Sequence, residues 1–276
     1  MAQNYASTFS PMAEEAYSLG SLTSLFSAKY SWTGVKTVSV FTNGTLALSD
    51  YSIPSGYGSP TVIGNTVDDL TVSKDRGFNG LIDRLLMESD EGVIAAASWL
   101  GEETRQRVVQ DIDAYRFLAL YTACPTAQIS TSAVITSANA YTAFLTEQSA
   151  LDEAKVPQVG RVAFATPQFI NSIKLDANYV KATEMAQNEV IFNGQVGAID
   201  GVPVIKVPSS IMNATDHHID FVIVHKDAVA APMKLEDVQI FETVPNWSGS
   251  QIQGRYVYDL FVLDAKNNGI RVHVHA

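Results

Sequence analysis

Hydrophobic residues at steps of three and four define the most regular segment of the chain, between Gly92 and Cys124, which contains no proline. The positions that follow this spacing are Val93, Ala97, Leu100, Thr104, Val108, Ile112, Tyr115 and Ala119. The spacing predicts an amphipathic helix of about 30 residues, on the order of 45 Å long at a rise of about 1.5 Å per residue. Pro125 ends it, because proline has no backbone N–H and clashes with the preceding turn.

The helix prediction decides the meaning of two carboxylates that stand one residue apart. On a strand Asp111 and Asp113 would point to the same face, but on a helix they lie about 200° apart around the axis. They are therefore not expected to share a metal or a proton. Asp113 can instead reach Arg116 one turn later, and Ile112 and Tyr115 are expected to face the body of the protein.

The segment before this helix predicts an arm and a projecting hairpin. Residues 1–32 have apolar positions at a rough helical spacing and one basic residue, Lys29, which indicates an amphipathic arm that needs a partner surface. Residues 35–41 alternate like a strand, and extended character resumes over 66–78. The stretch between them is rich in Gly, Ser, Thr and Pro, and a loop of that length usually has a function or lies against another surface.

The second half of the chain alternates helical and strand patterns, which predicts a mixed α/β subdomain. The predicted elements are a helix at 137–156 capped by Ser137, a strand at 160–167, a short helix at 168–174, strands at 201–208 and 218–225, and a helix at 226–232. The glycines at 194, 197 and 201 lack the pattern of a phosphate-binding loop and are interpreted as a loop and a tight turn before a strand.

The C-terminal part turns to β structure. Strands are predicted at 236–242, 254–265 and 270–276, and the Asn-Gly pair at 268–269 indicates a hairpin turn between the last two. His273 and His275 would share one face of the last strand. We interpret that strand as an exposed edge strand with polar residues, because a zinc site would need a third ligand and a fixed second shell.

Composition narrows the function classes. Only 17% of the 276 residues are charged, against about 25% in an average soluble domain, which favours a surface extensively covered by subunit contacts. The net charge of −11 argues against gripping nucleic acid by neutralising phosphates. Cys124 is the single cysteine, so no internal disulfide is possible and a reducing compartment is expected. No signal peptide or apolar run of membrane-spanning length is recognisable.

Several segments, in this order, resemble the major capsid proteins of tailed bacteriophages, notably those infecting Gram-positive hosts. They are KDRGFNGLID, GEETRQRVVQDIDAYRF, RVAFATPQFINSIK, GVPVIKVPSS, VIVHKDAVAAPMKLEDVQIF and SGSQIQGRYVYDLFVLDAKNNGI. They are distributed in this order between residues 74 and 270, and the ordered set carries the resemblance rather than any one motif.

The resemblance implies an α+β chain with the Hong Kong 97-type capsid fold. The implied parts are an N-terminal arm at 1–32, an extended loop (E-loop) at 33–80, a peripheral domain with the spine helix and a β-sheet at 81–125, a mixed α/β axial domain at 126–245, and C-terminal strands at 246–276 that return to the peripheral domain.

The implied function is that of a major capsid protein, without enzymatic activity, cofactor or metal. It would self-assemble into the pentamers and hexamers of an icosahedral or prolate head that encloses double-stranded DNA. Its other partners would be a portal protein at one vertex and a separate scaffolding protein, because only about 32 residues precede the loop. Assembly would take place in the host cytoplasm, the mature location would be the virion, and no membrane would be involved.

Two alternatives remain beside this function. The first is an encapsulin-type compartment, whose shell protein shares the fold but encloses an enzyme. The second is a metal-dependent hydrolase that would use His217, His218, His273 and His275. A phage tail-tube protein is a poorer match, because the long helix has no place in it.

Candidate subunit-interface residues come from the hairpin, the sequence at its base and the long helix. Lys74 and Arg76 flank Asp75, which indicates ion pairing at the base of the hairpin rather than a phosphate site. The full candidate set is Tyr51, Tyr57, Lys74, Arg76, Glu103, Arg107, Asp113 and Arg116.

Overall fold

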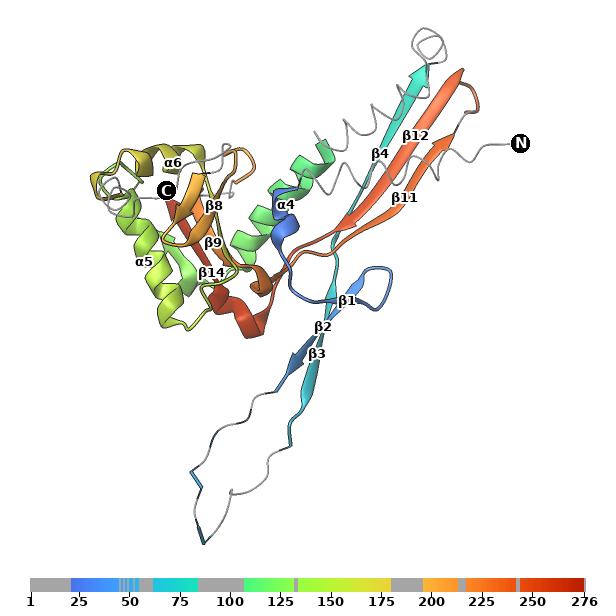
Figure 1. Cartoon of the computed structure of the whole chain (residues 1–276). Helices are drawn as coiled ribbons and strands as arrows, with labels where there is room; N and C mark the ends of the chain where they lie inside the picture. The colour runs from blue at the N-terminus through green and yellow to red at the C-terminus, as the bar shows by residue number, and fades with distance from the viewer. Residues whose placement is uncertain are drawn as a thin grey trace.

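The molecule is elongated, with a compact half, a helix beside it, a narrow sheet on the far side and a hairpin that projects from the junction (Figure 1). The computed structural model describes residues 21–44, 46, 48, 50–51, 53–54, 62–83, 107–131, 134–179, 196–212, 217–241 and 244–275. Helices and strands are both well represented, so the predicted α+β class is confirmed.

The compact half is built on a six-stranded mixed sheet. Its strands, in spatial order, are β5 (Ile129–Thr131), β14 (Ile270–His275), β9 (His218–His225), β6 (Arg161–Ala165), β8 (Val202–Lys206) and β7 (Val196–Ile199). β9 runs antiparallel to both of its neighbours, β14 and β6, whereas β6 and β8 are parallel. All five residues of β6 are buried: Val162–Ala165 form an apolar run, as expected for a strand covered on both faces, and the buried Arg161 donates to Asp152.

Two helices, α5 (Ala140–Glu153) and α6 (Pro167–Lys174), cover one face of this sheet (Figure 1). α6 begins where predicted, because Pro167 fits the first turn and the Thr166 side chain accepts a hydrogen bond from the Phe169 backbone N–H. Phe221 of β9 lies at the centre of an aromatic group, with ring centroids 4.6 Å from Phe169 and 5.5 Å from Phe144. This group lies in the core on the α5–α6 side of the sheet, and a second hydrophobic cluster fills the other side.

Helix α4 (Val109–Ala123) connects the two halves, because it is hydrophobic on two faces. Phe117 packs against Phe164 of the six-stranded sheet, with ring centroids 5.2 Å apart. Ile112, one turn earlier, is fully buried against Tyr256 and Tyr258 on the other side. The predicted end of the long helix before Pro125 is confirmed, whereas its predicted first turns, before residue 107, lie outside the described residues.

The far side of the molecule is a three-stranded antiparallel sheet in the order β11 (Met233–Phe241), β12 (Gly249–Tyr258) and β4 (Lys74–Asp83). Burial alternates along β12: Ile252 and Tyr256 face inward, whereas Gln251, Gln253 and Arg255 are more exposed. A short ribbon of β10 (Val229–Ala230) and β13 (Phe261–Val262) joins this sheet to the compact half.

The predicted hairpin is confirmed. It consists of β2 (Thr37–Asn43) and β3 (Asn65–Thr71), in antiparallel register from Thr37 opposite Thr71 to Asn43 opposite Asn65, with β1 (Ser31–Trp32) added beside β2. Its base is fixed by Val38 and Val72, both buried against Val257 of β12. Beyond this base the hairpin extends away from the rest of the chain (Figure 1).

Two local predictions are wrong. The helix expected at 226–232 is a single 3-10 turn, η4 (Lys226–Ala228), followed by β10, because residues 229–230 pair with β13. The Asn-Gly pair at 268–269 does not make a hairpin but ends a 3-10 segment, η5 (Asp264–Gly269). The strands on either side of it enter different sheets, β13 beside β10 and β14 beside β9, so they cannot pair with each other.

Two further details also differ from the sequence expectation. Asn139 rather than Ser137 stands at the N-cap of α5, and the Asn139 side chain accepts a hydrogen bond from the Thr136 backbone N–H. β12 joins the narrow sheet, but β14 inserts between β5 and β9 in the six-stranded sheet. The return of all C-terminal strands to the sheet beside the long helix is therefore wrong for residues 270–275, whose apolar face completes the core of the compact half.

Replacing Phe221 by Ala is expected to lower the free energy of unfolding by about 3–5 kcal/mol, because the ring is fully buried among other rings. Urea denaturation followed by circular dichroism measures this loss. Phe41→Ala is the matched control: this ring is 66% exposed, so the change should stay within about 0.5 kcal/mol. Equal losses for the two variants would contradict this description of the core.

Candidate functional site

The histidines of β14 do not stand on an exposed edge, so that prediction is wrong. β14 lies inside the sheet, and His273 is 2% exposed. The Nδ1 atoms of His273 and His275 lie 3.1 and 2.9 Å from the same carboxylate oxygen, Oδ2 of Asp220. A carboxylate that accepts two N–H groups is a structural tie between neighbouring strands.

A β-bulge places Asp220 for this contact. His273 pairs with Phe221 and Val274 pairs with Ile219, so Asp220 is the extra residue on β9. The backbone oxygen of Asp220 also accepts hydrogen bonds from the N–H and the hydroxyl of Thr166. Sequence inspection missed Asp220 because a bulge leaves no mark in the hydrophobic pattern. Within the described residues no group of three or more His, Cys, Asp or Glu could hold a metal ion.

Cys124 lies at the C-terminal end of α4 and is 6% exposed. Burial raises the pKa of its thiol to about 11, which opposes formation of the thiolate that a nucleophilic cysteine needs. Its side chain packs in the core between α4 and the six-stranded sheet. In this position Cys124 acts as a small apolar residue of the core near a helix end.

The hairpin exposes hydrophobic side chains along its whole described length. They are Val35, Phe41, Leu46, Leu48, Tyr51, Ile53, Val62, Ile63 and Val67, each more than half exposed. Phe41 and Val67 stand opposite each other across the two strands and so form one apolar pair on one face. Among the residues that the structure describes, no second layer of the same chain covers this ribbon, which marks its surface as a contact surface for another molecule.

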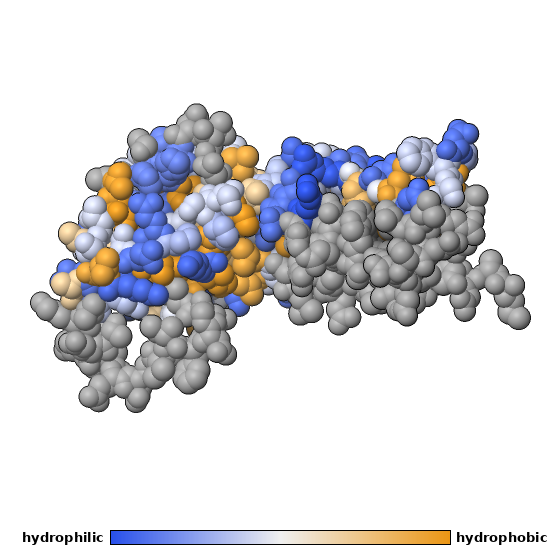
Figure 2. Space-filling view, turned by 90° about the horizontal axis from the view of Figure 1, so that it is seen from above, coloured by the Kyte–Doolittle hydropathy of each residue, from blue (hydrophilic) through white to orange (hydrophobic). Residues whose placement is uncertain are grey.

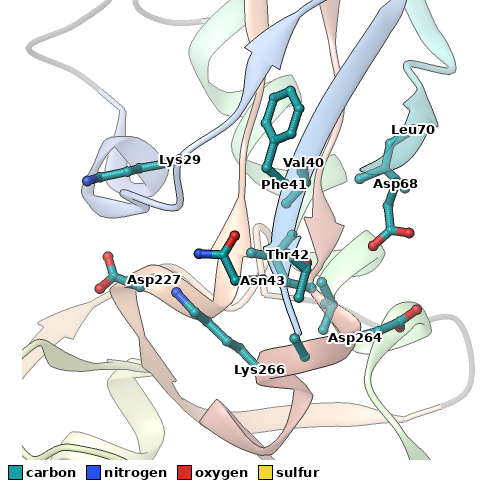
Figure 3. A pocket seen from close by; sticks show the side chains of 13 residues that line it. Lys29, Val40, Phe41, Thr42, Asn43, Asp68, Leu70, Asp227, Asp264 and Lys266 are labelled. Atoms are coloured by element: carbon teal, nitrogen blue, oxygen red, sulfur yellow. The ribbon is translucent and has the colours of Figure 1, made fainter. Parts of the chain in front are cut away.

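A pocket of about 510 Å³ lies between the hairpin and the compact half (Figure 3). Val40, Thr42 and Asp68 line it from the hairpin, and Asp264 and Lys266 line it from η5. Because this hollow separates the two walls, the hairpin is supported mainly at its base. The charged groups around the pocket have mixed signs and come from separate elements, without the paired geometry that a catalytic acid and base require.

Asp75 is the centre of an ion-pair group at the base of the hairpin. Its carboxylate accepts two hydrogen bonds from Arg255, at 2.7 and 2.6 Å, and lies 2.6 Å from Nζ of Lys36. The hydrogen bonds from Arg255 and from Lys36 hold the pKa of Asp75 well below its usual range. Ion pairing at this base is present as predicted, but the partners of Asp75 are Arg255 and Lys36 rather than the flanking Lys74 and Arg76, and the group joins β4 to β12 and to the start of the hairpin.

The neighbouring residue Arg76 points to the opposite face of β4 and pairs with Asp111 of α4. The Tyr258 hydroxyl donates to the other oxygen of Asp111 at 2.7 Å. Burial alone would raise the pKa of Asp111, but the bonds from Arg76 and Tyr258 outweigh it and lower this pKa. Lys74 lies over the Tyr115 ring at 4.9 Å and lines a cleft of about 290 Å³ on this side.

Asp111 and Asp113 lie on different faces of the helix, as predicted. Asp111 faces the narrow sheet, whereas Asp113 is 1% exposed and contacts residues 21–23. Arg116 is 3% exposed. The expected direct contact between Asp113 and Arg116 is not formed. Instead, both side chains bond to the Thr23 hydroxyl. Both charged groups are buried inside this one chain and hold contacts within it, so their assignment as subunit-contact residues stays a prediction.

The other candidate contact residues are distributed over distant surfaces. Tyr51 is 62% exposed on the hairpin, Lys74 and Arg76 are exposed at the base of the narrow sheet, and Arg107 is exposed at the start of the helix. Tyr57 and Glu103 lie outside the described residues. The structure does not bring these residues into one site. Figure 2 shows hydrophobic residues exposed among hydrophilic ones on the compact half as well.

Several solved structures have a similar fold. A structure from Mycobacterium phage Che8 has a TM-score of 0.63 and 18% identity, covering 87% of this chain and 85% of that chain. The capsid structure of Cyanophage P-SCSP1u has a TM-score of 0.66 and 14% identity, with coverages of 91% and 86%. A virus-like particle from Pyrococcus furiosus has a TM-score of 0.57 and 12% identity, with coverages of 98% and 100%.

No protein-family model matches the sequence, and no curated protein matches it. The structural similarity nevertheless defines the fold, which is that of the capsid proteins of tailed phages. The Hong Kong 97-type architecture implied by the sequence resemblance fits these neighbours. The part of the chain that the structure describes has no helix long and apolar enough to cross a membrane.

The buried thiol gives a direct test of the interpretation of Cys124. A thiol-specific chromogenic reagent at about pH 8 should react slowly with the native protein, because a thiol with a raised pKa stays protonated there. Addition of urea should make one thiol per chain react rapidly. Fast reaction in the native state, at the rate of a small free thiol, would contradict the burial of Cys124.

Proposed function

We propose that this chain is the major capsid protein of a tailed phage, a subunit that assembles into a closed head enclosing double-stranded DNA. The observation that carries the proposal is the projecting hairpin, whose apolar residues a single copy leaves exposed. The fold shared with phage capsid structures supports the same conclusion. In this role residues 1–32 act as an arm, 33–80 as the extended loop, 81–125 as the peripheral part and 126–245 as the axial part around the symmetry axes.

The physical logic is that of a repeated contact. Closed shells repeat one set of contacts around symmetry axes, here in pentamers and hexamers. Limbs that lie on neighbouring copies bring the buried area into the range of obligate interfaces, roughly 2,000 Å² and above. A hairpin supported mainly at its base can adjust its angle, so one sequence fits both five-fold and six-fold surroundings.

The net charge of −11 suits a shell that does not hold its DNA tightly. Genome entry is driven by a motor at the portal vertex, and a lining without strong affinity leaves the DNA free to leave. A separate scaffolding protein guides assembly in the host cytoplasm, and the finished protein resides in the virion. No enzymatic step belongs to this role.

A second candidate is a shell that is not a phage head, of the encapsulin type. The similarity to the virus-like particle from Pyrococcus furiosus, which extends over 98% of this chain, favours it. The contents of the particle separate the two candidates. Nuclease-protected DNA of uniform length in particles from infected cells supports a phage head, whereas an enclosed protein of another sequence supports a compartment.

Negative-stain microscopy of the expressed protein, with and without a co-expressed scaffold, tests the shell function. Icosahedral or prolate particles of uniform size are the expected result. A monomer that stays compact at high concentration with every candidate scaffold, and that turns over a small molecule, would overturn it.

The hairpin's role can be tested by shortening it. Deletion of residues 52–60 should leave the subunit folded, because the core lies elsewhere, but should prevent stable particles since neighbours lose their clasp. Circular dichroism measures folding, and microscopy with sedimentation measures assembly. Normal particles from this deletion would refute the role.

The apolar pair on the hairpin gives a finer test. Phe41→Ser should leave subunit stability nearly unchanged but should raise the concentration needed for assembly, because the ring is exposed in the single chain and covered in the shell. Thr66→Ala, on the opposite face of the same hairpin, is the matched control and should assemble more like the wild type. Equal effects of the two changes would argue against a contact at Phe41.

A further inference from the structure

Residues 21–28, here called the strap, cross the junction between the two halves of the molecule. They include a short 3-10 turn, η1 (Leu22–Leu25), that lies beside α4 (Figure 1). The strap is tied to α4 at one end and to the compact half at the other. Sequence inspection placed these residues in an arm that needs a partner surface, and the structure supplies that surface from within the same chain.

The first tie is a buried carboxylate. Asp113 accepts hydrogen bonds from the Ser21 hydroxyl at 3.0 Å, from the Leu22 backbone N–H at 2.9 Å and from the Thr23 hydroxyl at 2.7 Å. Asp113 and Thr23 are each 1% exposed. A buried carboxylate needs such donors, because the free-energy penalty of burying it without partners exceeds the average net stabilisation that its hydrogen bonds provide.

The Thr23 hydroxyl also connects to Arg116, whose guanidinium Nη1 donates to it at 2.7 Å. The other terminal nitrogen of Arg116 donates to the backbone oxygens of Ala231, at 3.0 Å, and of Pro232, at 3.4 Å. Residues 231–232 are the link between β10 and β11, where the chain passes from the compact half to the narrow sheet. Arg116 of α4 therefore connects the Thr23 hydroxyl of the strap to this link.

The second tie fixes the strap to the compact half. The Phe26 ring packs edge-on against Phe164 of β6, with centroids 5.8 Å apart, and Leu22 packs against the same core. The Ser27 N–H donates to the Lys226 backbone oxygen at 3.0 Å, and its hydroxyl donates to Asp227 at 2.9 Å. The strap thus contacts the six-stranded sheet and η4 as well as α4.

We propose that the strap is a brace that fixes the orientation of the compact half relative to the narrow sheet, with the Thr23 hydroxyl as its latch. Thr23 acts here as a positioning residue, through Asp113 and Arg116. When the latch is released, the link at 231–232 loses its tie to the strap and the two halves can change their relative angle. Its effect on shell shape rests on the proposed function, but the brace itself is a property of the single subunit.

The test measures the angle directly, as a distance between two spin labels on the purified full-length protein. Gln158→Cys places one label on an exposed loop of the compact half, and Ser248→Cys places the other at an exposed turn beside β12. Cys124 stays unlabelled because it is buried. Wild type and Thr23→Ser, which keeps the hydroxyl, should give the same single narrow distance distribution.

Thr23→Val removes the hydroxyl while keeping the shape of the side chain, so Asp113 and Arg116 each lose a partner. The expected result is a broader distribution or a second distance, with loss of hydrogen-exchange protection at the Leu22 amide. Ser24→Ala is the matched control, because the exposed Ser24 hydroxyl bonds only within the strap, to the Ser21 backbone oxygen. A folded Thr23→Val protein with the wild-type distribution would overturn the proposal.

Asp113→Asn is the second variant, for the case in which Thr23→Val does not fold. It keeps the size of the side chain but removes the charge and one acceptor oxygen. Broadening in Asp113→Asn supports the brace, and an unchanged distribution contradicts it. Because both outcomes are read from the subunit, failure of the brace is distinguishable from failure of the chain to form shells, which microscopy reports independently.

Discussion

The structure depends on one constraint: within the described residues, a single copy leaves the hydrophobic surface of its hairpin exposed. The compact half has a core covered on both faces of its sheet, and α4 closes the inner face of the narrow sheet. The hairpin has no such cover, and a two-stranded ribbon is at best marginally stable in water. Its exposed apolar residues are therefore intelligible only if a second molecule supplies the missing layer. The elongated outline, the low fraction of charged residues and the uncovered hairpin all agree with a surface that contacts other molecules.

Charged residues have two distinct roles in this framework. At the base of the hairpin, Asp75 with Lys36 and Arg255 forms a partly exposed group that orients β4 and β12, and such groups add little to stability individually. Inside the molecule, Asp113 and Arg116 are buried, so breaking either contact is costly and the local geometry is strongly specified. The ion pairs of Asp75 orient the base of the hairpin relative to β4 and β12. The buried contacts fix how the two halves meet.

Patterns within one element could be predicted from the sequence, and contacts between distant elements could not. The spacing around Ile112 predicts the helix that separates Asp111 from Asp113, and alternation over 35–41 predicts the first hairpin strand. The Asn-Gly pair at 268–269 misled, because local turn preference cannot reveal that β13 and β14 enter different sheets. The prediction that His273 lies on an exposed edge strand failed for the same reason. The order of strands in a sheet is set by packing between segments that are distant in the sequence. The apolar pair of Phe41 and Val67 could have been predicted, since a hydrophobic residue on each strand of a predicted hairpin indicates an apolar face.

The two halves also explain why a rigid brace and an adjustable hairpin can coexist in one subunit. In the proposed shell, one sequence has to repeat its contacts accurately while tolerating two kinds of symmetry environment. Accuracy requires that the compact half and the narrow sheet keep a fixed relation, which buried hydrogen bonds to charged groups provide, because a partly satisfied buried network is strongly unfavourable. Tolerance requires a part that can move without disturbing a core, which a hairpin held at Val38 and Val72 and separated from η5 by a hollow provides. The junction between the two halves is rigid and the hairpin is adjustable, so the two requirements are met by different segments. A change of symmetry environment then alters the angle of the hairpin rather than the fold.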